Sequence, residues 1–87
     1  MFYTYILFSE LTNKFYVGST GNLEDRINRH NSGRSKATKS GIPWKLVYTE
    51  NFENRSEAFK REMEIKNWKS HNRIEKLIIK YNEMQSA

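Results

Sequence analysis

The sequence contains no cysteine and only one proline among its 87 residues. Without cysteine, neither a disulfide framework nor a thiolate metal site can stabilise the fold, and a reducing compartment is the simplest setting. A chain of this length buries roughly 60 to 65 % of the surface that its unfolded form exposes. We therefore expect residues 1–87 to form a single domain, with its core over about residues 2–70 and a C-terminal helix over about 71–83.

Long apolar runs are also lacking. With tyrosine left aside, the longest are three residues each, Ile6 to Phe8 and Leu77 to Ile79. A bilayer span needs about 20 apolar residues and a signal peptide about 7 to 15. We therefore expect a cytoplasmic protein that has no membrane partner.

Acidic residues are the minority, with 10 Asp and Glu against 15 Lys and Arg, for a formal charge of +5. This balance favours contact with phosphate-rich polymers or an anionic surface, and charge alone does not choose between them. Aromatic residues make up 14 % of the chain and are spread along it, so most of them are expected in the core.

Alternating side chains predict three strands, over residues 2–9, 14–19 and 44–52. Turn-compatible residues at 10–13 join the first two strands into a hairpin. In the third strand, strict alternation would place one set of apolar side chains on a single face: Trp44, Leu46 and Tyr48.

The length of this turn predicts the register of the hairpin. If Ser9 pairs with Lys14, then Tyr5 lies opposite Gly18, and Tyr16 becomes a diagonal neighbour of Tyr5 on the same face. Gly18 would then leave space beside Tyr5 for backbone or substrate to approach.

Capping signals predict where two helices begin. Asn22 opens a helix that runs to about residue 31, and Asn54 with Glu57 opens one that runs to about Trp68. A third helix is predicted from apolar residues at i, i+3, i+4 and i+7, namely Ile74, Leu77, Ile78 and Tyr81.

The segment between the first helix and the third strand, residues 31–43, carries Arg34, Lys36 and Lys39 and no acidic residue. We expect an exposed basic loop. These cations are placed to follow a phosphate backbone, and a solvated loop is the alternative.

Charged residues occupy the expected inward faces of both predicted helices. Arg26 shares its stripe with Leu23, Ile27 and His30, and Glu62 lies one turn from the apolar residues Ala58, Phe59 and Ile65, with Met63 beside it. In the simpler interpretation, Arg26 extends along its helix to solvent and Glu62 pairs with Lys66. In the alternative, both helices border a shallow cleft on the tyrosine face of the hairpin.

Tyrosine, arginine and glutamate suit phosphodiester cleavage when they converge. The arginine fork stabilises charge on the phosphate, and a lone carboxylate suits Mg²⁺ that keeps most of its water. A tyrosine hydroxyl can orient or activate water where nearby cations lower its pKa.

The motifs resemble those of the GIY-YIG nucleases. Tyr16-Val17-Gly18 is similar to the second signature, and Arg26 follows Tyr16 by ten residues. Tyr3-Thr4-Tyr5 resembles the first signature without its glycine, with Tyr5 eleven residues before Tyr16. The segment 56–62 resembles the helix that carries the metal-binding glutamate of the family, here Glu62.

The resemblance implies an α+β fold, with a small three-stranded antiparallel sheet flanked by helices, as in small standalone members. It implies a DNA endonuclease that uses one Mg²⁺ or Mn²⁺ held by Glu62. Tyr5 and Tyr16 would position or activate water, and Arg26 would stabilise the phosphorane. His30 would assist proton transfer or hydrogen-bond the scissile phosphate. Three residues are candidates for an asparagine that closes the site: Asn67, Asn72 and Asn82.

Other interpretations stay open at this point. In one, the chain has the fold and binds nucleic acid without turnover, and in a weaker one it docks on an anionic membrane or a protein partner. The alternative for His30 is an ordinary buried histidine. Trp44 and Trp68 are expected in the core rather than stacked on bases. A two-metal site is not expected, because Glu64 lies on another face of the helix than Glu62. Single-stranded, duplex and branched DNA are all candidate substrates, and a monomer that nicks is the more economical expectation.

Overall fold

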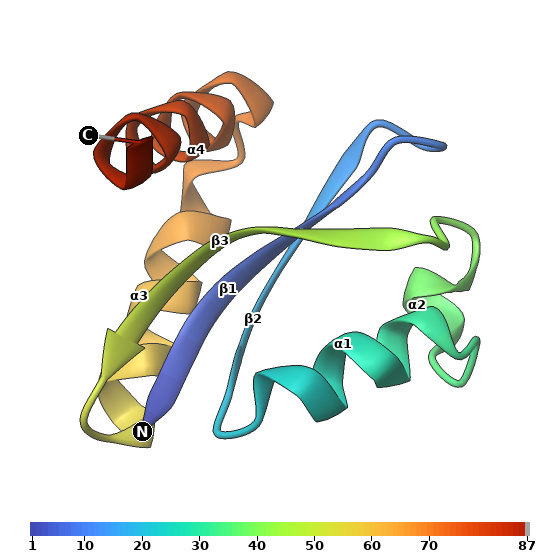
Figure 1. Cartoon of the computed structure of the whole chain (residues 1–87), viewed down its shortest axis with the longest axis horizontal. Helices are drawn as coiled ribbons and strands as arrows, with labels where there is room; N and C mark the ends of the chain where they lie inside the picture. Colours follow the sequence, from blue (N-terminus) through green and yellow to red (C-terminus); the bar gives the residue numbers. More distant parts are fainter. Residues whose placement is uncertain (87) are drawn as a thin grey trace.

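The computed structural model describes residues 1–86, within which the chain forms three strands and four helices (Figure 1). The strands are β1 (Phe2–Ser9), β2 (Lys14–Thr20) and β3 (Trp44–Phe52), and the helices are α1 (Leu23–Asn31), α2 (Lys36–Lys39), α3 (Arg55–Trp68) and α4 (His71–Ser86). The strands form one antiparallel sheet in the order β2-β1-β3. The predicted α+β class is confirmed.

The hairpin has the predicted register. Ser9 pairs with Lys14 and Tyr5 with Gly18, so the two signature tyrosines lie on the same face as neighbours. The turn at 10–13 closes with Asn13 at a φ of 56°, a left-handed conformation that asparagine tolerates better than most residues. β2 continues one residue beyond its predicted end.

The predicted alternation of the third strand is wrong. A register shift leaves Val47 as an extra residue in β3, opposite no residue of β1. Beyond this bulge, the side chains of β3 point to the opposite faces from those that strict alternation predicts. Trp44 consequently packs beside Tyr5, whereas Tyr48 is buried on the opposite face of the sheet. Leu46, which alternation grouped with Trp44 and Tyr48, is 41 % exposed.

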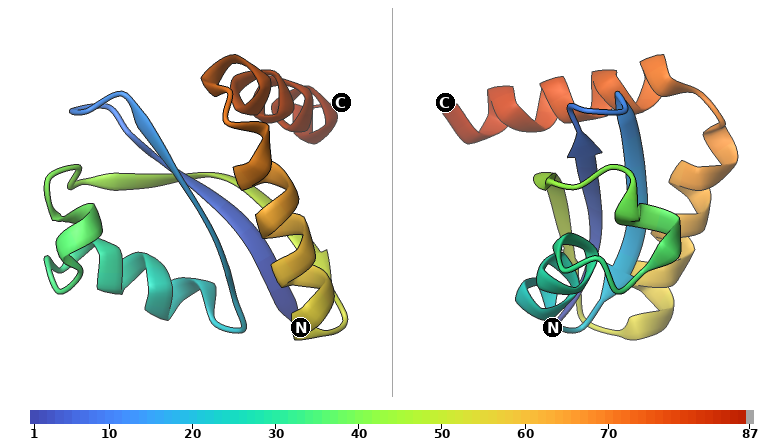
Figure 2. Two further views of the ribbon diagram at one scale, coloured as in Figure 1. Left: turned by 180° about the vertical axis from the view of Figure 1, so that it is seen from behind. Right: turned by 90° about the vertical axis from the view of Figure 1, so that its right-hand side faces the viewer.

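Helices cover both faces of the sheet (Figure 2). On one face, α1 contributes Leu23 and Ile27 to a cluster around Tyr5, Leu7 and Trp44. On the other face, α3 and α4 contribute Ile65 and Ile78 to a second cluster, which also contains the sheet residues Ile6, Val17 and Tyr48. The apolar stripe predicted for the last helix packs against this second cluster, and α4 runs to Ser86.

Both predicted helix starts are confirmed by their caps. The Asn22 side chain accepts a hydrogen bond from the amide of Asp25. Asn54 accepts one from the amide of Glu57 at 2.9 Å and donates its own Nδ2 to the Glu57 carboxylate at 2.9 Å.

The inward face of α3 differs from the predicted one. Phe59 and Met63 are 54 % and 38 % exposed, whereas Ala58, Glu62 and Ile65 are buried. The buried residues lie at i, i+4 and i+7, which is the narrow stripe that can contact one face of a sheet. Among the described residues, no helix is long and apolar enough to cross a membrane.

The basic loop contains a short helix that was not predicted. Within α2, Thr38 is fully buried, and its carbonyl accepts a hydrogen bond from Trp44 Nε1 at 2.7 Å. This hydrogen bond to the first residue of β3 holds α2 with Thr38 facing the interior. Its basic residues Arg34, Lys36 and Lys39 remain exposed, as expected.

Candidate active site

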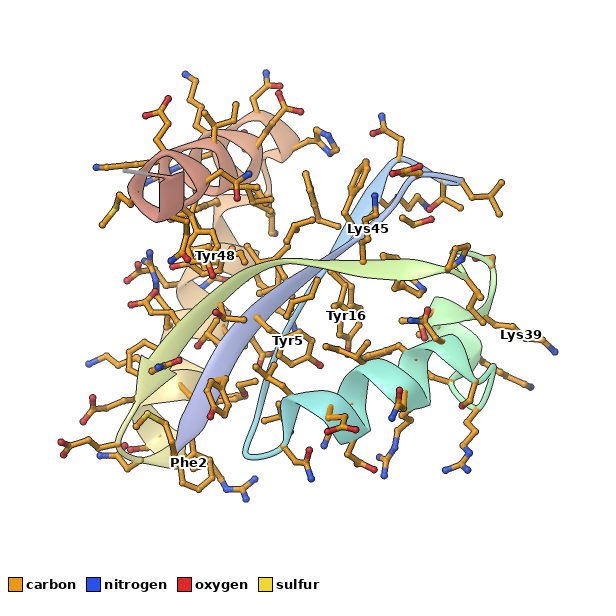
Figure 3. All side chains as sticks on the ribbon, in the orientation of Figure 1. Phe2, Tyr5, Tyr16, Lys39, Lys45 and Tyr48 are labelled. Carbon is orange, nitrogen blue, oxygen red and sulfur yellow. The ribbon has the colours of Figure 1, made fainter. Side chains whose placement is uncertain are left out.

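Three rings lie together between the sheet and α1. Tyr5 of β1 and Tyr16 of β2 have ring centroids 6.4 Å apart, and His30 of α1 lies 4.5 Å from Tyr16 and 6.3 Å from Tyr5. Figure 3 shows both tyrosines extending from the strands toward α1. Their exposure differs, because Tyr5 is fully buried and Tyr16 is half-buried.

Gly18 makes room for Tyr5 itself. A Cβ atom at this position would lie 2.5 Å from the Tyr5 hydroxyl oxygen and 2.6 Å from Cζ, well inside van der Waals contact. The space that the sequence assigned to backbone or substrate is therefore filled by the end of the Tyr5 ring.

His30 is hydrogen-bonded at both ring nitrogens. Its Nε2 lies 3.3 Å from the Tyr5 hydroxyl and its Nδ1 lies 3.1 Å from Thr38 Oγ1. Burial, followed by the charges of Arg26 and Arg29, lowers the pKa of His30. The imidazole is therefore neutral at pH 7 and carries one proton on nitrogen. The interpretation of His30 as a satisfied buried histidine describes its surroundings correctly.

The environment of Tyr5 raises the pKa of its hydroxyl to about 12. Burial is the largest cause, followed by the nearby Tyr16, and the guanidinium of Arg26 opposes both. The lowered pKa that would make a tyrosine a ready base is absent from Tyr5. Arg26 is half-buried beside this hydroxyl, as the predicted stripe required.

Glu62 reaches the site from α3, across the edge strand β2. Its Oε1 accepts a hydrogen bond from Ser19 Oγ at 2.7 Å, and its Oε2 pairs with Lys66 Nζ at 2.5 Å. Glu62 is 8 % exposed, and its charge contributes to the raised pKa of Tyr5. The predicted pair with Lys66 is thus present, and the carboxylate lies near enough to Tyr5 for its charge to act on that hydroxyl.

One part of the cleft prediction is wrong, because α3 does not border the tyrosine face. Ser19 alternates with Gly18 along β2, so its side chain lies on the face that α3 covers. Since β2 is an edge strand, the carboxylate can reach past it. The sequence offered no signal for Ser19 or Thr38, whose partners lie 43 and 8 residues away in the chain.

Glu62 would be the principal protein ligand of a cation at this site. Within residues 1–86, no group of three or more His, Cys, Asp and Glu side chains is placed to hold a metal ion. Glu64 is exposed and pairs with Arg61, as its position on another face of the helix predicts.

Of the remaining predicted residues, Trp44 borders the tyrosine cluster, with its ring centroid 6.4 Å from that of Tyr16. Lys39 points away from Tyr5 at the far end of the molecule (Figure 3). Trp44 is buried, as predicted, and Trp68 lies against the guanidinium groups of Arg61 and Arg73. The three asparagine candidates for closing the site are exposed residues of α3 and α4, namely Asn67, Asn72 and Asn82.

The sequence profile of the GIY-YIG catalytic domain matches residues 1–80. The chain belongs to the GIY-YIG family. This GIY-YIG domain is 45 % identical over 84 residues to a UPF0213 protein of Syntrophus aciditrophicus, covering 92 % of this chain and 91 % of the relative. It is 49 % identical over 67 residues to a UPF0213 protein of Clostridium perfringens, covering 76 % and 71 %.

A solved structure has the same fold. The solution NMR structure of a UPF0213 protein of Bacillus halodurans matches with a TM-score of 0.56 and 35 % sequence identity, covering 90 % of this chain and 83 % of that one. The predicted resemblance to a small GIY-YIG member is confirmed. The family is one of nucleases, and the names of these relatives state no reaction.

Proposed function

We propose that this protein is a divalent-metal-dependent DNA endonuclease, acting in the repair, recombination or processing of DNA. The observation that supports this most strongly is the meeting of the tyrosine pair, His30 and Arg26 on one side of β2 with Glu62 on the other. Hydrolysis of a phosphodiester needs groups that stabilise phosphate charge and orient water, and this set contains both.

Exposure divides the five proposed residues by role. Tyr16 and Arg26 are partly exposed, so they are the groups that can meet substrate. We assign Arg26 to the developing charge on the phosphorane and the Tyr16 hydroxyl to orientation of the attacking water. Tyr5 and His30 are 0 % and 4 % exposed, and we assign them to holding these groups in place.

The carboxylate of Glu62 suits one Mg²⁺ or Mn²⁺ ion that keeps most of its water. Ser19 binds one oxygen of the Glu62 carboxylate, and Lys66 binds the other. The Lys66 side chain is 43 % exposed and flexible, so its ammonium group can move away and leave Oε2 free to bind the ion. Such an ion, when bound, offsets charge on the attacked phosphate and the leaving oxygen. Ser19 would keep the carboxylate oriented by its hydrogen bond to Oε1.

The exposed cations Arg34, Lys36 and Lys39 would follow the DNA backbone beyond the site. Each phosphate that they neutralise adds roughly 0.7 to 0.9 to the slope of log affinity against log salt concentration. Binding through them is independent of sequence, so DNA structure rather than base sequence would select the substrate.

The test is cleavage of single-stranded, duplex and branched DNA with Mg²⁺, with Mn²⁺ and with EDTA. Wild-type protein should cut at least one of them only with metal, and Glu62→Gln should abolish cutting. Glu64→Gln is the matched control, because it removes a carboxylate two residues away that is exposed and paired with Arg61. Binding without cleavage under all conditions would instead show a nucleic-acid-binding module of this fold.

A further inference from the structure

Thr38 is one of the most deeply buried polar residues of the chain, with no exposed surface. It belongs to α2, whose neighbouring lysines Lys36 and Lys39 face solvent. Trp44 Nε1 donates to its carbonyl at 2.7 Å, and the amide of Gly41 donates to the same oxygen at 3.1 Å. The backbone of Thr38 is therefore held in place, and its hydroxyl meets His30 Nδ1 at 3.1 Å.

Titratable or charged groups reach His30 from three elements. Arg26 and Arg29 lie on its own helix, Tyr5 approaches from β1, and the Tyr16 ring contacts it from β2 at a tilt of 57°. The arginines and burial both disfavour the imidazolium form. A neutral imidazole has one N–H and one lone pair, so it donates to one of its two partners and accepts from the other.

The charge of Arg26 favours one of the two directions in which the imidazole N–H of His30 can point. The guanidinium of Arg26 acts on the Tyr5 hydroxyl as a nearby cation, so the hydroxyl dipole is oriented with its oxygen, rather than its hydrogen, toward Arg26. The hydroxyl hydrogen of Tyr5 is then directed to the other neighbour, His30 Nε2, at 3.3 Å. In this orientation Nε2 carries the lone pair, and Nδ1 carries the hydrogen that points at Thr38.

We propose that Thr38 is a positioning residue that holds His30 in the Nδ1–H tautomer, so that hydrogen bonds run in one direction from Tyr5 through His30 to Thr38. The terminal acceptor, Thr38 Oγ1, keeps the Tyr5 oxygen lone pairs turned to the guanidinium. Without it, the Nε2–H tautomer competes, and its hydrogen faces the same oxygen as Arg26 does. The consequence for cleavage rests on the proposed function, whereas the tautomer does not.

The experiment measures the His30 tautomer directly. Protein labelled with ¹⁵N-histidine is observed by long-range proton–nitrogen correlation at pH 7.5, and a His71→Gln variant identifies the signal of the second histidine. Wild type and Thr38→Ser should show Nδ1–H at His30. Thr38→Val, which keeps the shape but removes the acceptor, should shift the population toward Nε2–H.

The same variants are compared in DNA cleavage. Thr38→Val should lower kcat about tenfold, the size of one neutral hydrogen bond, and change KM by less than about twofold. Thr38→Ser should stay within about twofold of wild type. Thr4→Val is the matched control, because Thr4 is also fully buried and donates one hydrogen bond, to the Ala58 carbonyl at 2.7 Å. It should leave the His30 tautomer unchanged.

An Nε2–H tautomer in the wild type would overturn the proposal. This result does not depend on whether the Thr38 variants fold. So would a Thr38→Val protein with an unchanged tautomer and kcat. A wild type that shows Nδ1–H but cuts no DNA would support the assignment of Thr38 while removing the nuclease function, so the two failures are distinguishable.

Discussion

The contact between Gly18 and Tyr5 predicts that the smallest possible change, Gly18→Ala, is costly. The new Cβ would lie 2.5 Å from the Tyr5 hydroxyl oxygen and 2.6 Å from Cζ, about 1 Å inside ordinary contact. Tyr5 is fully buried and hydrogen-bonded, so the ring cannot simply swing into solvent. The φ angle of Gly18 is not positive, so no backbone strain contributes.

The net effect follows from two opposing contributions. Overpacking costs about 1 to 3 kcal/mol, and replacing a strand glycine by alanine returns about 0.5 to 1 kcal/mol. Because the approach to the Tyr5 oxygen is so close, the overpacking cost falls in the upper part of its range, about 2 to 3 kcal/mol. We therefore expect a net loss of about 1 to 2.5 kcal/mol in the free energy of unfolding, which lowers Tm by about 5 to 20 °C in a chain of this size. Displacement of Tyr5 should also weaken its bond to His30 and lower DNA cleavage.

Chemical denaturation and thermal melting followed by circular dichroism measure the effect. Gly21→Ala is the control, because its Cβ would meet only the edge of the Phe2 ring, at 3.2 Å, and Gly21 is exposed. It should change stability by less than about 0.5 kcal/mol. In a Tyr5→Leu background, which removes Cζ and the hydroxyl, the cost of Gly18→Ala should largely disappear. A Gly18→Ala protein with wild-type stability, or an equal cost in both backgrounds, would refute the steric argument.

Three further predictions concern charge. Because the pKa of His30 is lowered from 6.5, the unfolded chain binds more protons as pH falls below about 7; stability should therefore decline on acidification through that region, and His30→Gln should flatten the decline in urea titrations. Lys66→Met frees Glu62 of its ammonium partner and should lower the Mg²⁺ concentration for half-maximal cleavage about threefold, whereas an unchanged value would separate Lys66 from the metal site. Lys36→Gln with Lys39→Gln should reduce the salt slope of DNA binding by up to about 2, measured by fluorescence anisotropy, and an unaltered slope would place both lysines off the DNA.

Local patterns predicted a large part of this structure. The turn length determined the hairpin register, and so placed Tyr5 opposite Gly18 and next to Tyr16. The asparagines at 22 and 54 determined where α1 and α3 begin, since the caps act within three residues. Helical periodicity placed Arg26 and Glu62 on inward stripes, and the motif spacing identified the family.

Tertiary packing decided the rest, because it depends on contacts between distant segments. The bulge at Val47 assigns Trp44 and Tyr48 to opposite faces, and alternation within one strand cannot reveal a shift against its neighbour. For the same reason, the sequence could not show that α3 lies on the face away from the tyrosines, nor that Ser19 donates a hydrogen bond to Glu62.

The short helix α2 is the clearest case. Its sequence is basic and polar, and only the contacts with Trp44 and His30 turn Thr38 inward. By itself, the sequence determined which residue types meet at the site and which strands and helices carry them. The tertiary structure determined which of those residues are buried supports and which face the substrate, because burial is a property of all the segments packed together.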